Sequence, residues 1–233
     1  MASLGVKTRQ SSAGEERSGI ARTAGLALLL AASAYLMALS LRLEDARWLG
    51  WITLLPLFLS IRVLCPLESM LAGGFWGLML AAFSSHGSDA SLVPGFRSYA
   101  LLTLVPALYA AVASRVTRQV GFHPLLLGLG WVGVELALQP LTVRNGLLAA
   151  TQGDGLAIRA IGHLGGYLCV AFLVAYVNAS LLEMLTVVCP VGSARRVFTA
   201  AAGFIETLSH QLRWVVLTHP TLQTSPRGPP ATI

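Results

Sequence analysis

Hydrophobic residues in this chain gather into long blocks, separated by short polar segments that often contain Pro or Gly. A block of about 20 apolar residues in a helix matches the roughly 30 Å hydrocarbon core of a bilayer. We predict six membrane-spanning helices on this basis, near 21–41, 48–64, 67–85, 98–116, 122–140 and 161–186. The pattern therefore indicates an all-α fold, a polytopic bundle of transmembrane helices.

The amino-acid composition also indicates that the lipid bilayer surrounds most of this chain. Hydrophobic residues make up 55% of the 233 positions and charged residues only 11%, whereas a soluble domain carries about 25% charged residues. So few charges cannot cover a water-exposed surface. The sequence thus excludes a complete soluble catalytic domain and leaves room for one membrane domain.

The flanking segments are more polar. Within 197–217, apolar residues repeat at helical spacing but are interrupted by Glu206, His210 and Arg213. A central charge costs about 2.5–3.5 kcal/mol in a span, so an amphipathic helix on the inner membrane surface is favoured, with a seventh span as the alternative. The predicted regions are a disordered tail at 1–20, the six-helix domain at 21–186, the amphipathic helix or seventh span at 187–218, and a disordered tail at 219–233.

Basic residues indicate the orientation. With six spans and the N-terminus inside, the inner segments hold eleven of them and the outer segments five, which favours a cytoplasmic N-terminus. The inner set is Lys7, Arg9, Arg17, Arg22, Arg62, Arg115, Arg118, Arg195, Arg196, Arg213 and Arg227, and the outer set is Arg42, Arg47, Arg97, Arg144 and Arg159. The net charge of +6 is thereby explained by topology, and no nucleic-acid partner is expected. The outer loop at 141–160 is interpreted as solvated, with headgroup binding as the alternative.

Glu135 is the most informative single residue, because a carboxylate inside a span should have a partner or face a wet cavity. Trp131 lies one helical turn earlier on the same face. Two interpretations stay open. Glu135 lines a cavity that opens outward, or it is structural, either hydrogen-bonded to a neighbouring helix or placed at the interface near the outer end of its span. Asn178, in the last predicted span, is expected to bond across helices.

Other polar and small residues suggest structure rather than chemistry. Glycines cluster at Gly73, Gly74 and Gly77, where small residues allow helices to approach closely. Pro56 predicts a kink in the second helix. The cysteines form no CxxC pair, and the five histidines show no metal-ligand spacing. We therefore expect no metal site and no cofactor.

From the fifth helix onward the sequence resembles the membrane part of the apolipoprotein N-acyltransferases. The segment "WVGVE" at 131–135 is similar to that family's Trp-x-x-x-Glu pattern, and Thr151-Gln152 is similar to its Ser-Gln. The helix "GYLCVAFLVAYVNASL" resembles the family's Gly-containing helix that ends in Asn and a small residue. With weaker likenesses upstream, the resemblance covers roughly 22–186.

In that family the membrane domain is joined to an external nitrilase-like domain, whose Glu-Lys-Cys triad transfers an acyl chain from phospholipid to a lipoprotein. The resemblance implies the scaffold but not the triad, because the single lysine, Lys7, lies in the tail and no cysteine falls in a matching motif. Leu138 stands where the family usually has Arg, and Leu147 and Leu148 replace its Phe-Pro-Trp segment. We expect no catalytic residue here.

These observations favour a non-catalytic membrane module that holds lipid or anchors a partner protein, in the bacterial cytoplasmic (inner) membrane. Its expected partners are membrane phospholipid and a protein. Two alternatives stay open: the membrane half of a split lipoprotein N-acyltransferase, with the nitrilase-like domain supplied in trans, or an accessory subunit of a larger membrane complex. Candidate residues facing lipid or a partner are Trp131, Glu135, Gln152, Tyr167 and Asn178.

Overall fold

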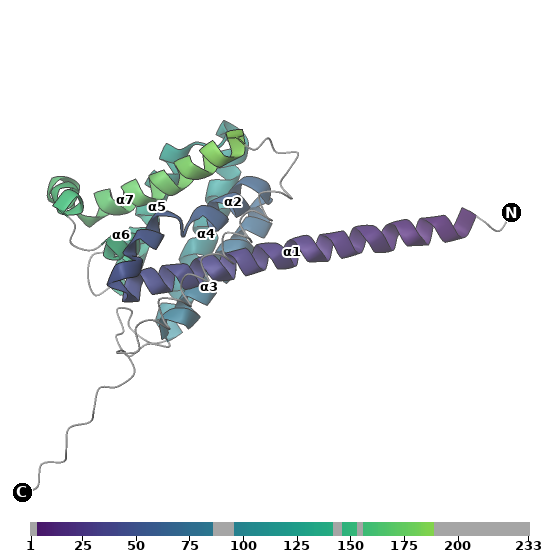
Figure 1. Cartoon of the computed structure of the whole chain (residues 1–233), viewed down its shortest axis with the longest axis horizontal. Coiled ribbons are helices and arrows are strands. Elements are labelled where there is room, and N and C mark those ends of the chain that lie inside the picture. The colour runs from purple at the N-terminus through teal and green to yellow at the C-terminus, as the bar shows by residue number, and fades with distance from the viewer. Residues whose placement is uncertain (1–3, 86–95, 142–145, 153–155, 189–233) are drawn as a thin grey trace, which may run out of the picture. The chain divides into compact units, whose positions relative to one another are not determined.

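The computed structural model describes residues 4–85, 96–141, 146–152 and 156–188, and every regular element in these ranges is helical (Figure 1). The second of the chain's two units, Gly192–Ile233, lies outside the described residues, as do the predicted amphipathic helix and C-terminal tail. In chain order the elements are α1 (Leu4–Arg42), η1 (Glu44–Trp51), α2 (Leu55–Val63), α3 (Pro66–Ser85), α4 (Phe96–Val120), α5 (Pro124–Leu138), η2 (Gln139–Leu141), α6 (Leu147–Gln152) and α7 (Leu156–Val188).

Six of these helical stretches are long and apolar enough to cross a membrane, which confirms the predicted fold class. They are Thr23–Arg42, Glu44–Val63, Pro66–Ser85, Phe96–Val120, Pro124–Leu141 and Gly165–Val187. Each overlaps one predicted span. The prediction succeeds because the bilayer acts on each segment separately, so that length and hydropathy suffice to identify a span.

The first helix is longer than its span. α1 begins at Leu4, whereas the sequence predicts a disordered tail over 1–20. The physical reason is local: no Pro interrupts the segment. Extending an existing helix by one residue adds a hydrogen bond without the cost of a new nucleus.

The second span is discontinuous. It consists of the 3₁₀-helix η1 and the α-helix α2, with a break at residues 52–54. Pro56 lies in the first turn of α2, where its missing N–H leaves no intrahelical bond unmade. The predicted kink at Pro56 is therefore wrong: the chain is interrupted before the proline, and the proline begins a new helix.

Helices α3 and α4 are in the most extensive contact of any pair. Gly73 and Gly77 face the backbone of α4 so closely that a Cβ atom at either position would collide with a carbonyl oxygen, that of Pro106 or of Leu102. A Cβ at Gly74 would lie 3.5 Å from Ala107, an ordinary contact. Pro106 has no N–H to offer the Leu102 carbonyl, so the oxygen that Gly77 approaches is one that the helix itself leaves free.

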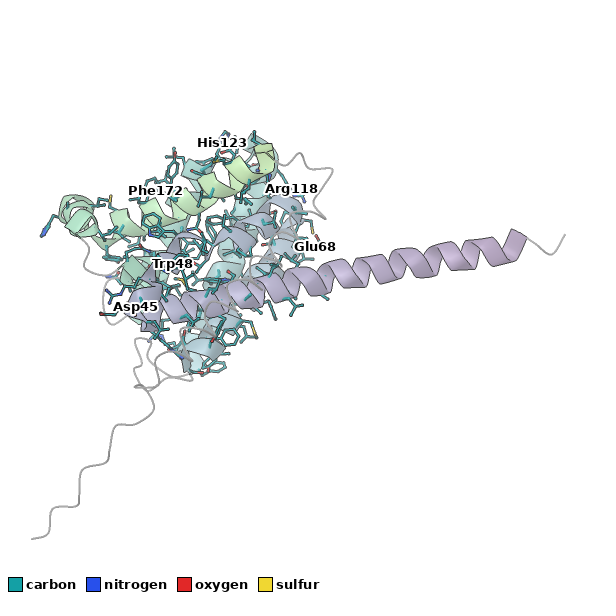
Figure 2. The ribbon with its side chains drawn as sticks, viewed as in Figure 1. Asp45, Trp48, Glu68, Arg118, His123 and Phe172 are labelled. Carbon is teal, nitrogen blue, oxygen red and sulfur yellow. The ribbon has the colours of Figure 1, made fainter. Side chains whose placement is uncertain are left out.

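Charged and polar side chains mark the two ends of the bundle. Figure 2 shows Asp45 and Trp48 at one end, and Glu68, Arg118 and His123 at the other. At the first end, the Arg42 guanidinium donates to the carbonyl oxygens of Phe83 (2.5 Å) and Ser84 (3.1 Å) at the close of α3. The arginine thereby satisfies carbonyls that the helix end leaves without partners.

The segment 141–160 is not the solvated loop that we expect from its sequence. It contains α6, in which Leu147, Leu148 and Thr151 are buried. α6 packs beside α7 and η1 (Figure 1). α7 is interrupted at Gly166, which has φ 69° and ψ −172°. The part that begins at Leu156 is therefore a separate helical piece, and it leads into the sixth span, which begins at Gly165. Ile158 and Ile161 of this piece pack against the core.

Candidate functional site

The Glu135 side chain is fully buried and accepts three hydrogen bonds. Its Oε1 accepts from Trp131 Nε1 (3.2 Å) and from the backbone N–H of Leu148 (2.8 Å), and its Oε2 accepts from the N–H of Leu147 (2.5 Å). Leu147 and Leu148 begin α6, where backbone N–H groups have no partner within the helix. A carboxylate from α5 therefore caps a short helix 12 residues further along the chain.

Gly146 allows this cap to form. Its φ of +73° belongs to the left-handed region, which glycine enters without a steric cost. A Cβ at this position would lie 2.5 Å from Glu135 Oε2 and 2.9 Å from the Tyr167 ring. The carboxylate and the ring therefore both lie against the face of Gly146 that a side chain would occupy, and a larger residue would collide with both.

Asn178 of α7 plays the equivalent role at the break in the second span. Its Oδ1 accepts from the N–H of Leu54 (3.0 Å), and its Nδ2 donates to the carbonyls of Gly50 (3.1 Å) and Val174 (2.8 Å). The side chain is fully buried. In a bilayer an interrupted helix is tolerated only where protein groups satisfy the freed backbone, and here one amide side chain satisfies both sides of the break.

Two further side chains support the break from its other side. The Ser33 hydroxyl of α1 donates to the Thr53 carbonyl, and Trp76 Nε1 of α3 donates to Ser33 Oγ (2.9 Å). The Thr53 hydroxyl donates back to the Gly50 carbonyl (3.3 Å). Helices α1, α3 and α7 thus all hold the interrupted span in place.

The interrupted span and α6 meet at Gly50. A Cβ there would lie 2.6 Å from Gln152 Nε2 and would also collide with the Thr151 hydroxyl. Gln152 Nε2 donates to Thr151 Oγ1 (2.7 Å), and that hydroxyl donates to the Leu148 carbonyl (2.7 Å). We use the name polar seam for Gly50, Glu135, Thr151, Gln152 and Asn178, which join η1 and α6 to the regular helices.

Trp131 lies at the centre of an aromatic cluster. Its ring is edge-to-face with those of Tyr109 (centroids 5.3 Å apart), Trp76 (6.0 Å) and Phe58 (6.5 Å). This arrangement is the one that aromatic quadrupoles favour. The Tyr109 hydroxyl donates to the Leu127 carbonyl (2.9 Å). The cluster connects α2, α3, α4 and α5, and it fixes the ring whose N–H reaches Glu135.

The structure separates the predicted site residues into two groups. Trp131, Glu135 and Asn178 are each 0% exposed and packed among protein groups, whereas Gln152 and Tyr167 are partly exposed. Of the two interpretations of Glu135, the geometry corresponds to the structural hydrogen bond.

Sequence reasoning missed Gly50, Ser33 and Thr53, which complete the seam and its support. The sequence feature that could have identified Gly50 is its position among large apolar residues, in "WLGW" at 48–51. Among the described residues no three His, Cys, Asp or Glu side chains gather as a metal site would require.

Six apolar helices long enough to span a bilayer, held together by buried polar caps, define a multi-pass helical membrane protein. The family model of the apolipoprotein N-acyltransferase N-terminal domain matches residues 33–180. The chain belongs to this family, and the match covers the second to fifth spans, half of the first, most of the sixth, and the entire polar seam. Comparisons with curated proteins and with solved structures gave no match.

Proposed function

We propose that this chain is a non-catalytic membrane module that anchors a partner protein, using the end of the bundle where η1 and α6 meet. The observation that carries the proposal is that the buried polar groups of the seam serve the fold. Glu135 accepts three protein hydrogen bonds and Asn178 takes part in three. Neither is left free to act on a substrate, while both fix the short helices that a partner would meet.

The same end of the bundle offers a surface for such a partner. Trp48 of η1 is 53% exposed and Leu43 beside it is 44% exposed. Acidic Glu44 and Asp45 are next to them, and Glu44 forms an ion pair with Arg47 (2.9 Å). Tryptophan is among the residues most enriched in binding hot spots. Gln152 and Tyr167 are the partly exposed residues of the site, and they would lie at the edge of the contact.

The first experiment is affinity purification of the full chain in mild detergent. We expect a protein partner in fixed ratio to the chain. The Trp48→Ala variant should lose it, because truncating a hot-spot residue costs about 2 kcal/mol or more, or about 30-fold in affinity. The matched control is Leu67→Ala at the start of α3, a residue 64% exposed outside η1 and α6, which should retain the partner. Equal recovery with both variants would exclude this surface as the anchor.

Family membership favours a second candidate, the membrane half of a lipoprotein N-acyltransferase whose nitrilase-like domain is a separate chain. The identity of the partner separates the two: a co-purified nitrilase-like protein supports the split enzyme, and an unrelated protein supports the anchor. The non-catalytic interpretation itself fails if the purified chain, given phospholipid alone, forms an acyl-thioester on Cys65, Cys169 or Cys189.

The orientation forms part of this proposal. The excess of basic residues on one side supports a cytoplasmic N-terminus in the bacterial inner membrane, so the η1 and α6 end would face outward. A cysteine-labelling reagent that cannot cross the membrane should modify a Trp48→Cys variant in intact cells. Labelling only after lysis would reverse the orientation.

A further inference from the structure

Arg62 presents an unsatisfied buried donor at the end of the bundle opposite Trp48. It is the second-to-last residue of the span Glu44–Val63. Its guanidinium carbon lies 4.8 Å from the centroid of the Phe122 ring, a cation–π contact. Its Nη1 is buried and has no hydrogen-bond partner among the described residues. A buried charged donor without an acceptor is costly, so native proteins rarely contain one.

The platform beneath this arginine is well defined. α4 ends at Val120, and the next residue, Gly121, has φ +90° and donates its N–H to the Thr117 carbonyl (3.0 Å). The His123 ring is hydrogen-bonded to the Val120 carbonyl (2.9 Å). These two contacts on either side of Phe122 fix the turn between α4 and α5. The Phe122 ring therefore lies on a defined turn of the backbone, with the Arg62 guanidinium against it.

Further positive charge lies nearby. Arg115 and Arg118 are exposed near the end of α4, and the Ser114 hydroxyl donates to the Leu64 carbonyl (3.0 Å), which joins this turn of α4 to the end of α2. Glu68, also at this end, accepts from the Cys65 N–H (3.0 Å). Figure 2 shows Arg118, His123 and Glu68 together at this end.

We infer that Arg62 binds the phosphate of an anionic phospholipid headgroup, with Arg115 and Arg118 supplying the surrounding positive charge. The position of Arg62 across the membrane is consistent with this binding, because Arg62 lies at the boundary of its span, where the phosphates of one leaflet lie. The chemistry also fits, because a planar guanidinium offers paired donors to phosphate oxygens. Orientation by the positive-inside rule alone requires only that arginines be present. It does not require one to be stacked on a ring with a buried donor lacking an acceptor.

The first test uses the full wild-type chain, delipidated in a non-ionic detergent, with native mass spectrometry of added lipid. We expect phosphatidylglycerol to bind about tenfold more tightly than phosphatidylcholine with the same acyl chains. Millimolar inorganic phosphate should not displace the lipid. Equal affinity for the two lipids would overturn the inference, and so would complete displacement by inorganic phosphate, which would assign the site to a free anion.

The second test compares matched variants. Arg62→Gln should abolish the preference for phosphatidylglycerol, whereas Arg97→Gln, the same change near the opposite end of α4, should retain it. Phe122→Leu leaves every charge in place and should weaken the preference severalfold, because the platform is lost. Should Arg62→Gln not fold, Arg62→Lys keeps the charge without the paired donors and should also weaken it. A preference unchanged in the folded Arg62 variant would refute the assignment.

Discussion

Replacing Glu135 by Gln removes one of the two carboxylate oxygens that hold the start of α6. In the wild-type chain Oε1 accepts from Trp131 and Leu148, and Oε2 accepts from Leu147 at 2.5 Å. The amide of Gln has one acceptor oxygen and one NH₂ group, which can only donate. Whichever way the amide is turned, at least one donor of the site would face another donor.

The magnitude follows from the single lost bond. A hydrogen bond to a charged group contributes about 1.5–3 kcal/mol, and a buried donor left unpaired costs about 1–3 kcal/mol. These two energies describe the same interaction and are not added. We therefore expect Glu135→Gln to lower the stability of α6 by about 2–3 kcal/mol. Local opening of α6 should then be about 30- to 150-fold more frequent in Glu135→Gln.

Hydrogen exchange measures this opening directly, because protected amides exchange through local unfolding. The purified full chain is followed by mass spectrometry on peptides that cover 147–152. We expect exchange there to accelerate by the factor above, with little change in α3 and α4, which pack against each other. The control is Glu183→Gln, since the Glu183 carboxylate has no hydrogen bond or ion pair to the described residues.

Two results would refute the reasoning. If α6 amides exchange at the same rate in the wild type and in Glu135→Gln, the carboxylate does not hold the helix. If Glu183→Gln accelerates α6 as much as Glu135→Gln does, the effect belongs to charge in general rather than to the three hydrogen bonds.

Two other substitutions test the packing and the interrupted span. Gly77→Ala should lower the stability of the chain in detergent by about 1–3 kcal/mol, because the added methyl group meets the α4 backbone. Gly74→Ala, the control, should change the stability little. Equal melting temperatures for the two variants would show that the helices separate without cost. Asn178→Leu should lower the stability by about 2–4 kcal/mol, because the break loses a donor and an acceptor together. Thr186→Val, which removes a hydroxyl bonded only within α7 among the described residues, should be close to neutral, and a matching loss would contradict the role of Asn178.

Hydropathy was enough to predict the six spans, because insertion into a bilayer depends on the length and polarity of each segment alone. The same argument indicated that Glu135 and Asn178 needed partners, since a polar group within hydrocarbon is costly. The quoted likeness over 131–135 and 151–152 likewise lies on residues that the structure places in or beside the polar seam.

The partners themselves were decided only by the tertiary structure. Asn178 binds groups more than 120 positions earlier in the chain, and no local pattern encodes so distant a contact. α6 has six residues, too few for a hydrophobic period to be visible, and it forms because Glu135 caps it and its apolar side chains are buried. The break at 52–54 was equally hidden, because an interrupted span has the hydropathy of a continuous one and differs only in which protein groups satisfy its backbone.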